Sequence, residues 1–337
     1  MTYPNLPAKQ ILAGIALLSL VTLSGSLRYA AADTSFNGIQ AQGVFTISDN
    51  VNLVLLDVSV KRPKGGYVTG LQKSSFKVFE DGRAREITQF DSIDAPVTIG
   101  LVVDNSGSMR DKKPEVTMAG LSFAKESNLQ DEFFVVNFNN SVLRGLPADM
   151  MFTDNLQQLR SALYYGSPIG QTALYDAIAY SLKHLEYGHH EKRTLIVVSD
   201  GGDNVSRTTY PELMRMIEAS RSTIYTVGLY DAGDNDANPG VLRKIAAVSG
   251  GEFFQPEKLE DILPVFDKIS QDIRNSYTIG YVPDETTDHR TVRSVKVLAQ
   301  EHDHRLIVHT RTTYVTTPLS DLMAEQKQKP KQMETIH

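Results

Sequence analysis

The chain has 337 residues, of which 41% are hydrophobic and 22% are charged, a composition typical of soluble globular domains. The formal net charge of −6 argues against a nucleic-acid partner, because such partners attract basic surfaces. No cysteine is present, which excludes disulfides, zinc–thiolate centres, thiol nucleophiles and a lipid-modified cysteine anchor.

Residues 1–32 predict a signal peptide. Lys9 precedes an apolar run over residues 11–27, and the small residues Ala30 and Ala32 follow it, as at a leader-peptide cleavage site. A membrane-spanning helix needs about 20 apolar residues, more than this run offers, and an uncleaved membrane anchor is the alternative. We therefore expect an exported protein that is periplasmic, at the cell surface or secreted.

A small β segment is predicted next in the chain. Residues 33–50 are polar and contain glycine, as in a linker. Within residues 51–95, the run 51–60 is rich in β-branched residues, and 76–80 alternates between apolar and polar side chains. An Asp-Gly pair follows directly, which is a strong hairpin signal.

From about residue 96 strands and helices alternate. Continuous apolar runs, typical of strands buried on both faces, lie at 97–104, 133–138, 194–200 and 223–229, with a short one at 252–254. Helical patterns lie between and after them, from Pro114 and over 156–163, 172–185, 211–221, 241–248 and 259–274. This rhythm predicts an α/β domain over 96–275: a doubly wound, mostly parallel, Rossmann-like sheet with helices on both faces.

The C-terminal part returns to a strand pattern. Within residues 276–317, the runs 276–281, 292–299 and 305–315 read as strands. We expect them to pair with residues 51–95, so that both flanks of the α/β domain form one small β-sandwich. Residues 318–337 carry several lysines and few apolar residues, which predicts a disordered tail.

Polar clusters follow two of the buried strands. The segment DNSGSM begins at Asp104, and the segment SDGGDN contains Asp200. In open α/β sheets ligands bind beyond the carboxyl ends of the strands. Hard divalent cations take oxygen ligands, and Asp104, Ser106 and Ser108 lie on one tight loop eased by a glycine. Thr172 and Asp200 are well placed at neighbouring strand ends to supply further oxygens.

The segments DNSGSM, GQTALYDAI and TLIVVSDGGDN together resemble a von Willebrand factor type A domain with its metal-ion-dependent adhesion site. The resemblance covers residues 96–275. The phrases FKVFEDG and YTIGYVPD also resemble an acidobacterial group of such proteins, in which flanking β segments accompany the domain.

This resemblance implies roles for five residues. Ser106, Ser108 and Thr172 would supply hydroxyl ligands to Mg²⁺, with Mn²⁺ or Ca²⁺ as alternatives, and Asp104 and Asp200 would contact the ion directly or through water. An open sixth position would accept an Asp or Glu side chain of a protein partner. The implied function is adhesion or scaffolding.

Two alternatives belong to other classes. A metal-assisted hydrolase would use Asp104 and Asp200, with Asp111 and Asp203 as the nearest additional acids, although such sites usually gather more carboxylates. A structural component of an envelope or secretion assembly would use the cation only to stabilise its fold. The sequence contains no P-loop and no G-x-S-x-G nucleophile elbow, and so favours a binding protein over an enzyme.

Other polar groups have ordinary interpretations. The acidic run 231–238 reads as a solvated loop, and the run 302–304 (HDH) as a hairpin turn rather than a metal site. Arg110, Lys112 and Lys113 read as exposed charges just past the metal loop (residues 104–108) that could favour an acidic partner. The pair Tyr164-Tyr165 (YY) reads as packing.

Overall fold

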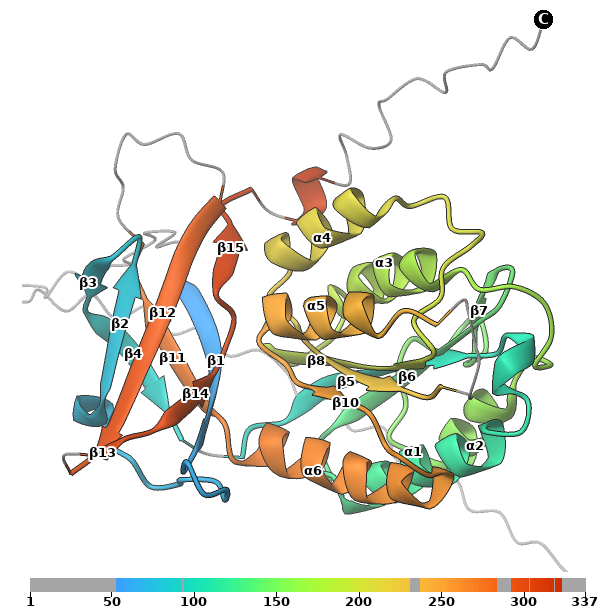
Figure 1. Cartoon of the computed structure of the whole chain (residues 1–337), viewed down its shortest axis with the longest axis horizontal. Coiled ribbons are helices and arrows are strands. Elements are labelled where there is room, and N and C mark those ends of the chain that lie inside the picture. The colour runs from blue at the N-terminus through green and yellow to red at the C-terminus, as the bar shows by residue number, and fades with distance from the viewer. Residues whose placement is uncertain are drawn as a thin grey trace, which may run out of the picture. The chain divides into compact units, whose positions relative to one another are not determined.

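The computed structural model describes residues 53–92, 94–230, 237–283, 292–302, 304–317 and 319–322 (Figure 1). The expected signal peptide, the linker and most of the acidic run lie outside these ranges. Among the helices that the model describes, none is long and apolar enough to cross a membrane.

An α/β domain with one six-stranded sheet is formed by the central part of the chain, counted over the described residues. The strand order is β10-β9-β8-β5-β6-β7, and all neighbours pair in parallel except β6 and β7, which are antiparallel. The strands are β5 (Val97–Asp104), β6 (Glu132–Phe138), β7 (Val142–Arg144), β8 (Lys192–Ser199), β9 (Thr223–Gly228) and β10 (Phe253–Phe254). The predicted doubly wound, mostly parallel sheet is confirmed.

Helices cover both faces of this sheet (Figure 1). Helices α1, α2 and α6 lie on one face, where α1 contacts the other two, and α3, α4 and α5 lie on the opposite face. Their bounds are α1 (Lys113–Glu126), α2 (Leu156–Tyr164), α3 (Leu174–Leu185), α4 (Tyr210–Ala219), α5 (Pro239–Ser249) and α6 (Ile262–Arg274). All six were predicted at nearly these positions from the recurrence of their apolar residues.

Strand β5 lies in the centre of the sheet, and every one of its residues is buried. Gly100, in its middle, leaves room for two neighbours: a Cβ atom there would collide with the side chains of Phe134 in β6 and Leu195 in β8. The central strand therefore packs tightly against both parallel partners, and its end is held in a fixed position.

The two flanks of the α/β domain form the predicted β-sandwich. One sheet has the order β14-β1-β11-β4, and the other contains β13-β12-β2-β3 with β15 added to β12. The strands are β1 (Val54–Lys61), β2 (Phe76–Glu80), β3 (Arg83–Arg85), β4 (Ile87–Asp91), β11 (Tyr277–Tyr281), β12 (Val292–Glu301), β13 (His304–Arg305), β14 (Ile307–His309) and β15 (Thr313–Val315). The rings of Phe76, Phe90 and Tyr277 meet in its core at centroid distances of 5.0 to 5.7 Å.

The prediction of one strand over 305–315 is wrong. The chain changes sheets there: β14 pairs with β1, whereas β15 pairs with β12. Arg311 lies at the crossing, is buried, and donates a hydrogen bond to the Ser222 carbonyl at 3.3 Å. Alternating side chains do not reveal such a change of partner, because both halves remain extended.

The prediction of a disordered tail does not hold for residues 319–322, which are helical. Leu319 is only 4% exposed and belongs to the hydrophobic core of the α/β domain. A single apolar residue with a fitting pocket is enough to dock such a segment, and composition averaged over twenty residues hides it.

A buried carboxylate joins the sandwich to the α/β domain. Asp272, on α6, is 2% exposed and accepts hydrogen bonds from the hydroxyls of Ser59 in β1 at 2.7 Å and Tyr225 in β9 at 2.6 Å. Lys61 in β1 forms an ion pair with the same carboxylate at 3.3 Å. The carboxylate therefore links three elements that are distant in sequence, β1, β9 and α6.

We expect Asp272→Ala to destabilise the protein by about 3 kcal/mol, because it leaves the buried Ser59 and Tyr225 hydroxyls without their acceptor and removes one of the two carboxylates that pair with Lys61. Urea unfolding of the full chain measures this change. Gln271→Ala, at an exposed position one residue earlier on α6, is the matched control and is expected to change the free energy of unfolding by less than about 0.5 kcal/mol. Equal midpoints for the two variants would show that Asp272 has no linking role.

His184 lies buried on α3 against the sheet. Its ring centroid is 4.4 Å from that of Phe134 and 5.1 Å from that of Phe152, and its Nε2 is 2.9 Å from the Met151 carbonyl, to which it donates. Burial lowers the pKa of the imidazole below its ordinary value, although the hydrogen bond to Met151 opposes this shift. The native state therefore holds His184 in its neutral form.

A histidine whose folded pKa is lowered takes up its proton more readily in the unfolded chain, so stability falls as the pH drops below about 6.5. His184→Gln keeps a donor for Met151 and removes this titration. We expect its free energy of unfolding to vary less between pH 7.5 and pH 5.5 than that of the parent chain. His304→Gln, at an exposed position, serves as the control, and identical pH slopes for His184→Gln and the parent would contradict the assignment.

Candidate metal site

The site begins where β5 ends. Asp104 is the last residue of the strand and has no solvent exposure. Its Oδ1 accepts a hydrogen bond from the Ser106 backbone N–H at 2.8 Å, and its Oδ2 accepts one from the Ser199 hydroxyl at 2.7 Å. The Ser199 hydroxyl also accepts from the Gly201 N–H at 3.0 Å. The carboxylate thus ties the loop after β5 to the loop after the neighbouring strand β8.

A row of side-chain oxygens crosses from one loop to the other. The hydroxyls of Ser106 and Ser108 are 3.1 Å apart, and the Ser108 hydroxyl donates to Asp200 Oδ2 at 2.7 Å. The other oxygen of Asp200 accepts from the Gly202 N–H at 3.0 Å. Gly201 between them has a φ of +80°, a conformation in which glycine is favoured, so the turn after β8 can bring Asp200 towards Ser108.

Thr172 lies on the adjacent loop before α3. Its N–H donates to Asn204 Oδ1 at 2.9 Å, and its carbonyl accepts from the Asn204 N–H at 3.0 Å, so the loop after β8 fixes its backbone. Two residues earlier the Gly170 carbonyl accepts from the Gly107 N–H of the metal loop at 3.2 Å. The structure therefore joins four of the five predicted residues in one hydrogen-bonded row and places the fifth, Thr172, beside them without a hydrogen bond to the other four.

Two lysines that the sequence suggested as exposed are buried. Lys112 is 5% exposed and donates to the Leu229 carbonyl at 3.0 Å, and Lys113 is 7% exposed and donates to the Gly166 carbonyl at 2.8 Å. They therefore hold neighbouring loops around the site instead of facing a partner. A charged residue on a short loop gives no sequence signal of this role, because its carbonyl partners lie far away along the chain.

The electrostatics of the site favour a cation. Burial raises the pKa of the Asp104 carboxyl to about 6, hydrogen bonds from Ser199 and Ser106 oppose the shift, and the nearby Asp200 carboxylate adds to it. Two carboxylates close together and out of water repel each other, and a divalent cation between them would relieve that repulsion.

The oxygen spacing also fits a small hard cation. Neighbouring ligands of an octahedral Mg²⁺ at 2.0–2.1 Å are separated by about 3 Å. The oxygens of Ser106, Ser108 and Asp200 lie 3.1 and 2.7 Å apart in the row, close to this separation. Ser108 is exposed whereas Asp104, Ser106 and Asp200 are buried, so the row opens to solvent at Ser108, its middle residue.

The additional acids do not extend this donor set. Asp203 Oδ1 accepts from the Tyr175 N–H at 3.0 Å, at the start of α3, and from the Ser206 hydroxyl. Asp111 is exposed and lines a small hollow with Ser108. Within the described ranges, no group of three or more His, Cys, Asp or Glu side chains is placed to hold a metal. The site is therefore rich in hydroxyls and poor in carboxylates.

The histidines of the HDH run lie elsewhere. His302 has a φ of +50° in the turn between β12 and β13, as expected for a hairpin turn. The pair Tyr164 and Tyr165, read from sequence as packing, is instead half exposed, at 49% and 53%.

A family comparison identifies the domain that carries this site. Residues 99–202 match the family model of the von Willebrand factor type A domain. The chain therefore contains a von Willebrand factor type A domain, as its motifs predicted.

Solved structures of such domains are similar to this chain. A von Willebrand factor type A protein from Catenulispora acidiphila is 14% identical, over 80% of this chain and 75% of that one, with a TM-score of 0.48. The vWF domain of the type V pili tip protein Mfa5 from Porphyromonas gingivalis is 15% identical, over 54% and 96% of the two chains, with a TM-score of 0.42. An aerotolerance-related membrane protein from Bacteroides fragilis is 15% identical, over 52% and 98%, with a TM-score of 0.43. Among curated proteins, none matches the chain.

Ser199 is the supporting residue that the sequence interpretation missed. We expect Ser199→Ala to lower the free energy of unfolding in EDTA by about 1–3 kcal/mol, because Oδ2 of the buried Asp104 carboxylate loses its hydroxyl donor and the Gly201 N–H loses its acceptor. Chemical unfolding measures the change, with Ser161→Ala on the exposed side of α2 as the control. If both variants unfold at the denaturant concentration of the parent, Ser199 does not support the site.

Proposed function

We propose that the α/β domain binds a divalent cation such as Mg²⁺ through Asp104, Ser106, Ser108, Thr172 and Asp200, and through it captures a carboxylate of a protein partner. The observation that carries this proposal is the row of oxygens from Ser106 to Asp200, at octahedral spacing and open to solvent at Ser108. When bound, the cation would supply an electrophilic position for an Asp or Glu side chain.

The donor set supports binding rather than catalysis. Hydroxyls are neutral ligands and leave a bound cation electron-poor, which favours an external anionic ligand. Metal sites that activate water usually gather more carboxylates, and here Asp203 is engaged with the start of α3. We propose an exported adhesion or scaffold protein, whose N-terminal segment is a cleaved leader or a membrane anchor.

Cation binding is tested directly with the full chain. In isothermal titration with MgCl₂ we expect saturable binding to the parent and a loss of at least about tenfold in affinity, equal to about 1.4 kcal/mol, in Ser106→Ala. The melting temperature of the parent should rise with Mg²⁺ and fall back on adding EDTA, because a ligand that binds only the native state stabilises it. Ser161→Ala should behave as the parent does, and Mg²⁺ binding that is unchanged in Ser106→Ala would overturn the site.

The role of the cation is tested by comparing pull-downs from the envelope fraction with Mg²⁺ and with EDTA. We expect a partner that is retained with Mg²⁺ and released both by EDTA and by Ser106→Ala. A Mg²⁺-dependent turnover of p-nitrophenyl phosphate that is lost in Asp200→Asn would show a hydrolase instead. A melting temperature that falls in EDTA while association persists would show that the cation serves only the fold.

A further inference from the structure

The free edge of the α/β sheet lies at β7. This strand pairs with β6 in the register Asn137↔Leu143, and no other strand pairs with it in the part of the chain that the structure describes. The Gly145 N–H donates to Val135 O at 2.8 Å, and the Asn139 N–H donates to Ser141 O at 3.1 Å. Since bonded residues alternate along an antiparallel ladder, residues 141, 143 and 145 face β6.

The backbone N–H and C=O groups of Val142 and Arg144 therefore point away from the sheet. Neither residue's backbone makes a hydrogen bond to another group among the described residues. Such an edge is the template on which an extended chain can pair. Two residues offer up to four backbone hydrogen bonds, two donated and two accepted.

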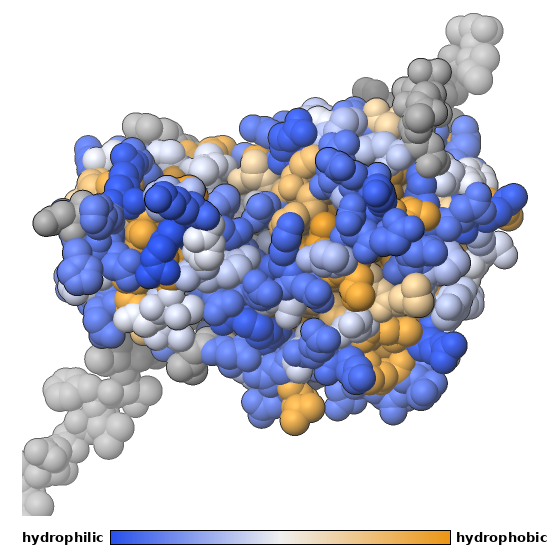
Figure 2. Space-filling view, turned by 60° about the horizontal axis from the view of Figure 1, so that its bottom comes forward, coloured by the Kyte–Doolittle hydropathy of each residue, from blue (hydrophilic) through white to orange (hydrophobic). Residues whose placement is uncertain are grey.

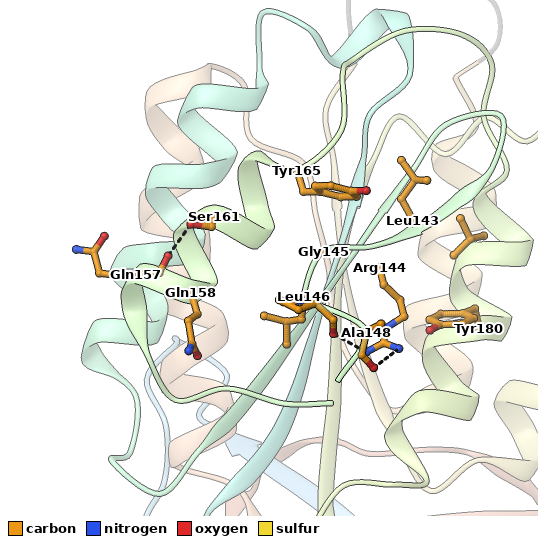
Figure 3. A pocket seen from close by; sticks show the side chains of 12 residues that line it. Leu143, Arg144, Gly145, Leu146, Ala148, Gln157, Gln158, Ser161, Tyr165 and Tyr180 are labelled. Carbon is orange, nitrogen blue, oxygen red and sulfur yellow. Dashed lines mark hydrogen bonds between the residues drawn. The ribbon is translucent and has the colours of Figure 1, made fainter. Parts of the chain in front are cut away.

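A groove of about 930 Å³ runs along this edge. Figure 3 shows Gln157, Gln158 and Ser161 of α2 on one side and Tyr180 of α3 on the other, with the segment from β7 to Ala148 between them. The groove lies beside the sheet, where an additional strand about 4.8 Å from β7 would have to lie. Its two walls would receive the side chains that alternate along that strand.

The lining of the groove selects the chemistry of its occupant. Leu143 and Tyr165 supply apolar surface, and Arg144 is the one charged residue among the lining residues that the structure describes, with no carboxylate beside it. The Arg144 guanidinium is held at the groove by hydrogen bonds to the carbonyls of Pro147 and Met150, at 3.0 and 2.9 Å. This charge favours a neutral or acidic segment over a basic one.

Tyr165 connects the groove to the metal loop. Its carbonyl accepts from Asn105 Nδ2 at 3.1 Å, and its ring lines the groove with 53% of its surface exposed. Asn105 lies between Asp104 and Ser106, the first two residues of the candidate site. Figure 2 shows one face of the molecule, on which hydrophilic residues dominate and hydrophobic residues form separate patches.

We propose that β7 and this groove form a second partner-binding surface, on which an extended, neutral or acidic segment of a protein partner pairs as an additional strand of the α/β sheet. This inference goes beyond the proposed cation-dependent capture and does not require the cation. Backbone pairing would provide affinity, and the alternating contacts with Tyr165 and with Tyr180 would provide specificity.

The test uses a phage library of random dodecapeptides selected on the full chain in EDTA, so that the metal site cannot contribute. We expect enriched peptides with alternating apolar residues and no net positive charge. Methylation of single backbone nitrogens in a selected peptide should weaken binding about five- to tenfold at two positions, separated by one position without effect, because only the carbonyls of Val142 and Arg144 are available to accept. Equal effects at all positions, no effect at any, or a library from which nothing is enriched would overturn the proposal.

Val142→Pro tests the protein side, because it removes an outward N–H and leaves the ladder to β6 intact. We expect about five- to tenfold weaker peptide binding, whereas Val142→Thr, which keeps the N–H and the β-branched shape, should bind as the parent does. Circular dichroism reports whether the proline variant folds, and the methylation series decides the question if it does not. A dimer in analytical ultracentrifugation that Val142→Pro abolishes would place a second copy of this chain in the groove and overturn the assignment to a partner.

Discussion

The geometry of the candidate site depends on one buried carboxylate, that of Asp104. It ends a strand on which every residue is buried, so its position is set by the core of the sheet and not by the loop that follows. Through the Ser106 N–H and the Ser199 hydroxyl it holds two loops that come from neighbouring strands. Because the charge lies out of water beside a second carboxylate, the same arrangement that orders the loops also disfavours an uncompensated negative charge there.

Most of the α/β domain follows from its sequence because its strands and helices are long. The strands β5, β6, β8 and β9 have six to eight residues and the six helices have nine to fourteen, long enough for their apolar patterns to be recognised. The three residues of β7 are too few for a period, and so the edge strand and its groove are visible only in the structure. The sandwich was predictable as a set of strands, but the change of sheet at Arg311 was not, since Arg311 there donates a hydrogen bond to Ser222, a residue 89 positions earlier in the chain.

The residues of the candidate site could be predicted from the sequence, but the residues that support them were harder to predict. Asp104, Ser106, Ser108 and Asp200 are named by the strand–loop pattern, and the structure brings their atoms together. Ser199 carried a weak signal, since a serine at the last position of a buried strand must place its hydroxyl somewhere polar. Lys112 and Lys113 carried none. The direction of each lysine side chain is set by the carbonyl to which it donates, at residue 229 or 166. The spacing of residues in the sequence does not reveal these partners.

The sandwich is assembled from two segments that lie on either side of a whole domain, and this has a consequence for the order of folding. The Tyr277 hydroxyl donates to the carbonyl of Val68, 209 residues away. Closing so long a loop in an unstructured chain is slow, since non-local pairing must wait for the chain ends to meet. Arg274, at the end of α6, forms ion pairs with Asp94 at 2.6 Å and with Asp131 at 2.5 Å, close to the start of β5. Once the α/β domain has formed, its first and last residues already lie close together. Only a short loop then remains to be closed before the strands of the sandwich can pair. We therefore expect the α/β domain to fold before the sandwich, and a chain synthesised only as far as β10 holds β1 without β11 and β14, the two strands with which it pairs.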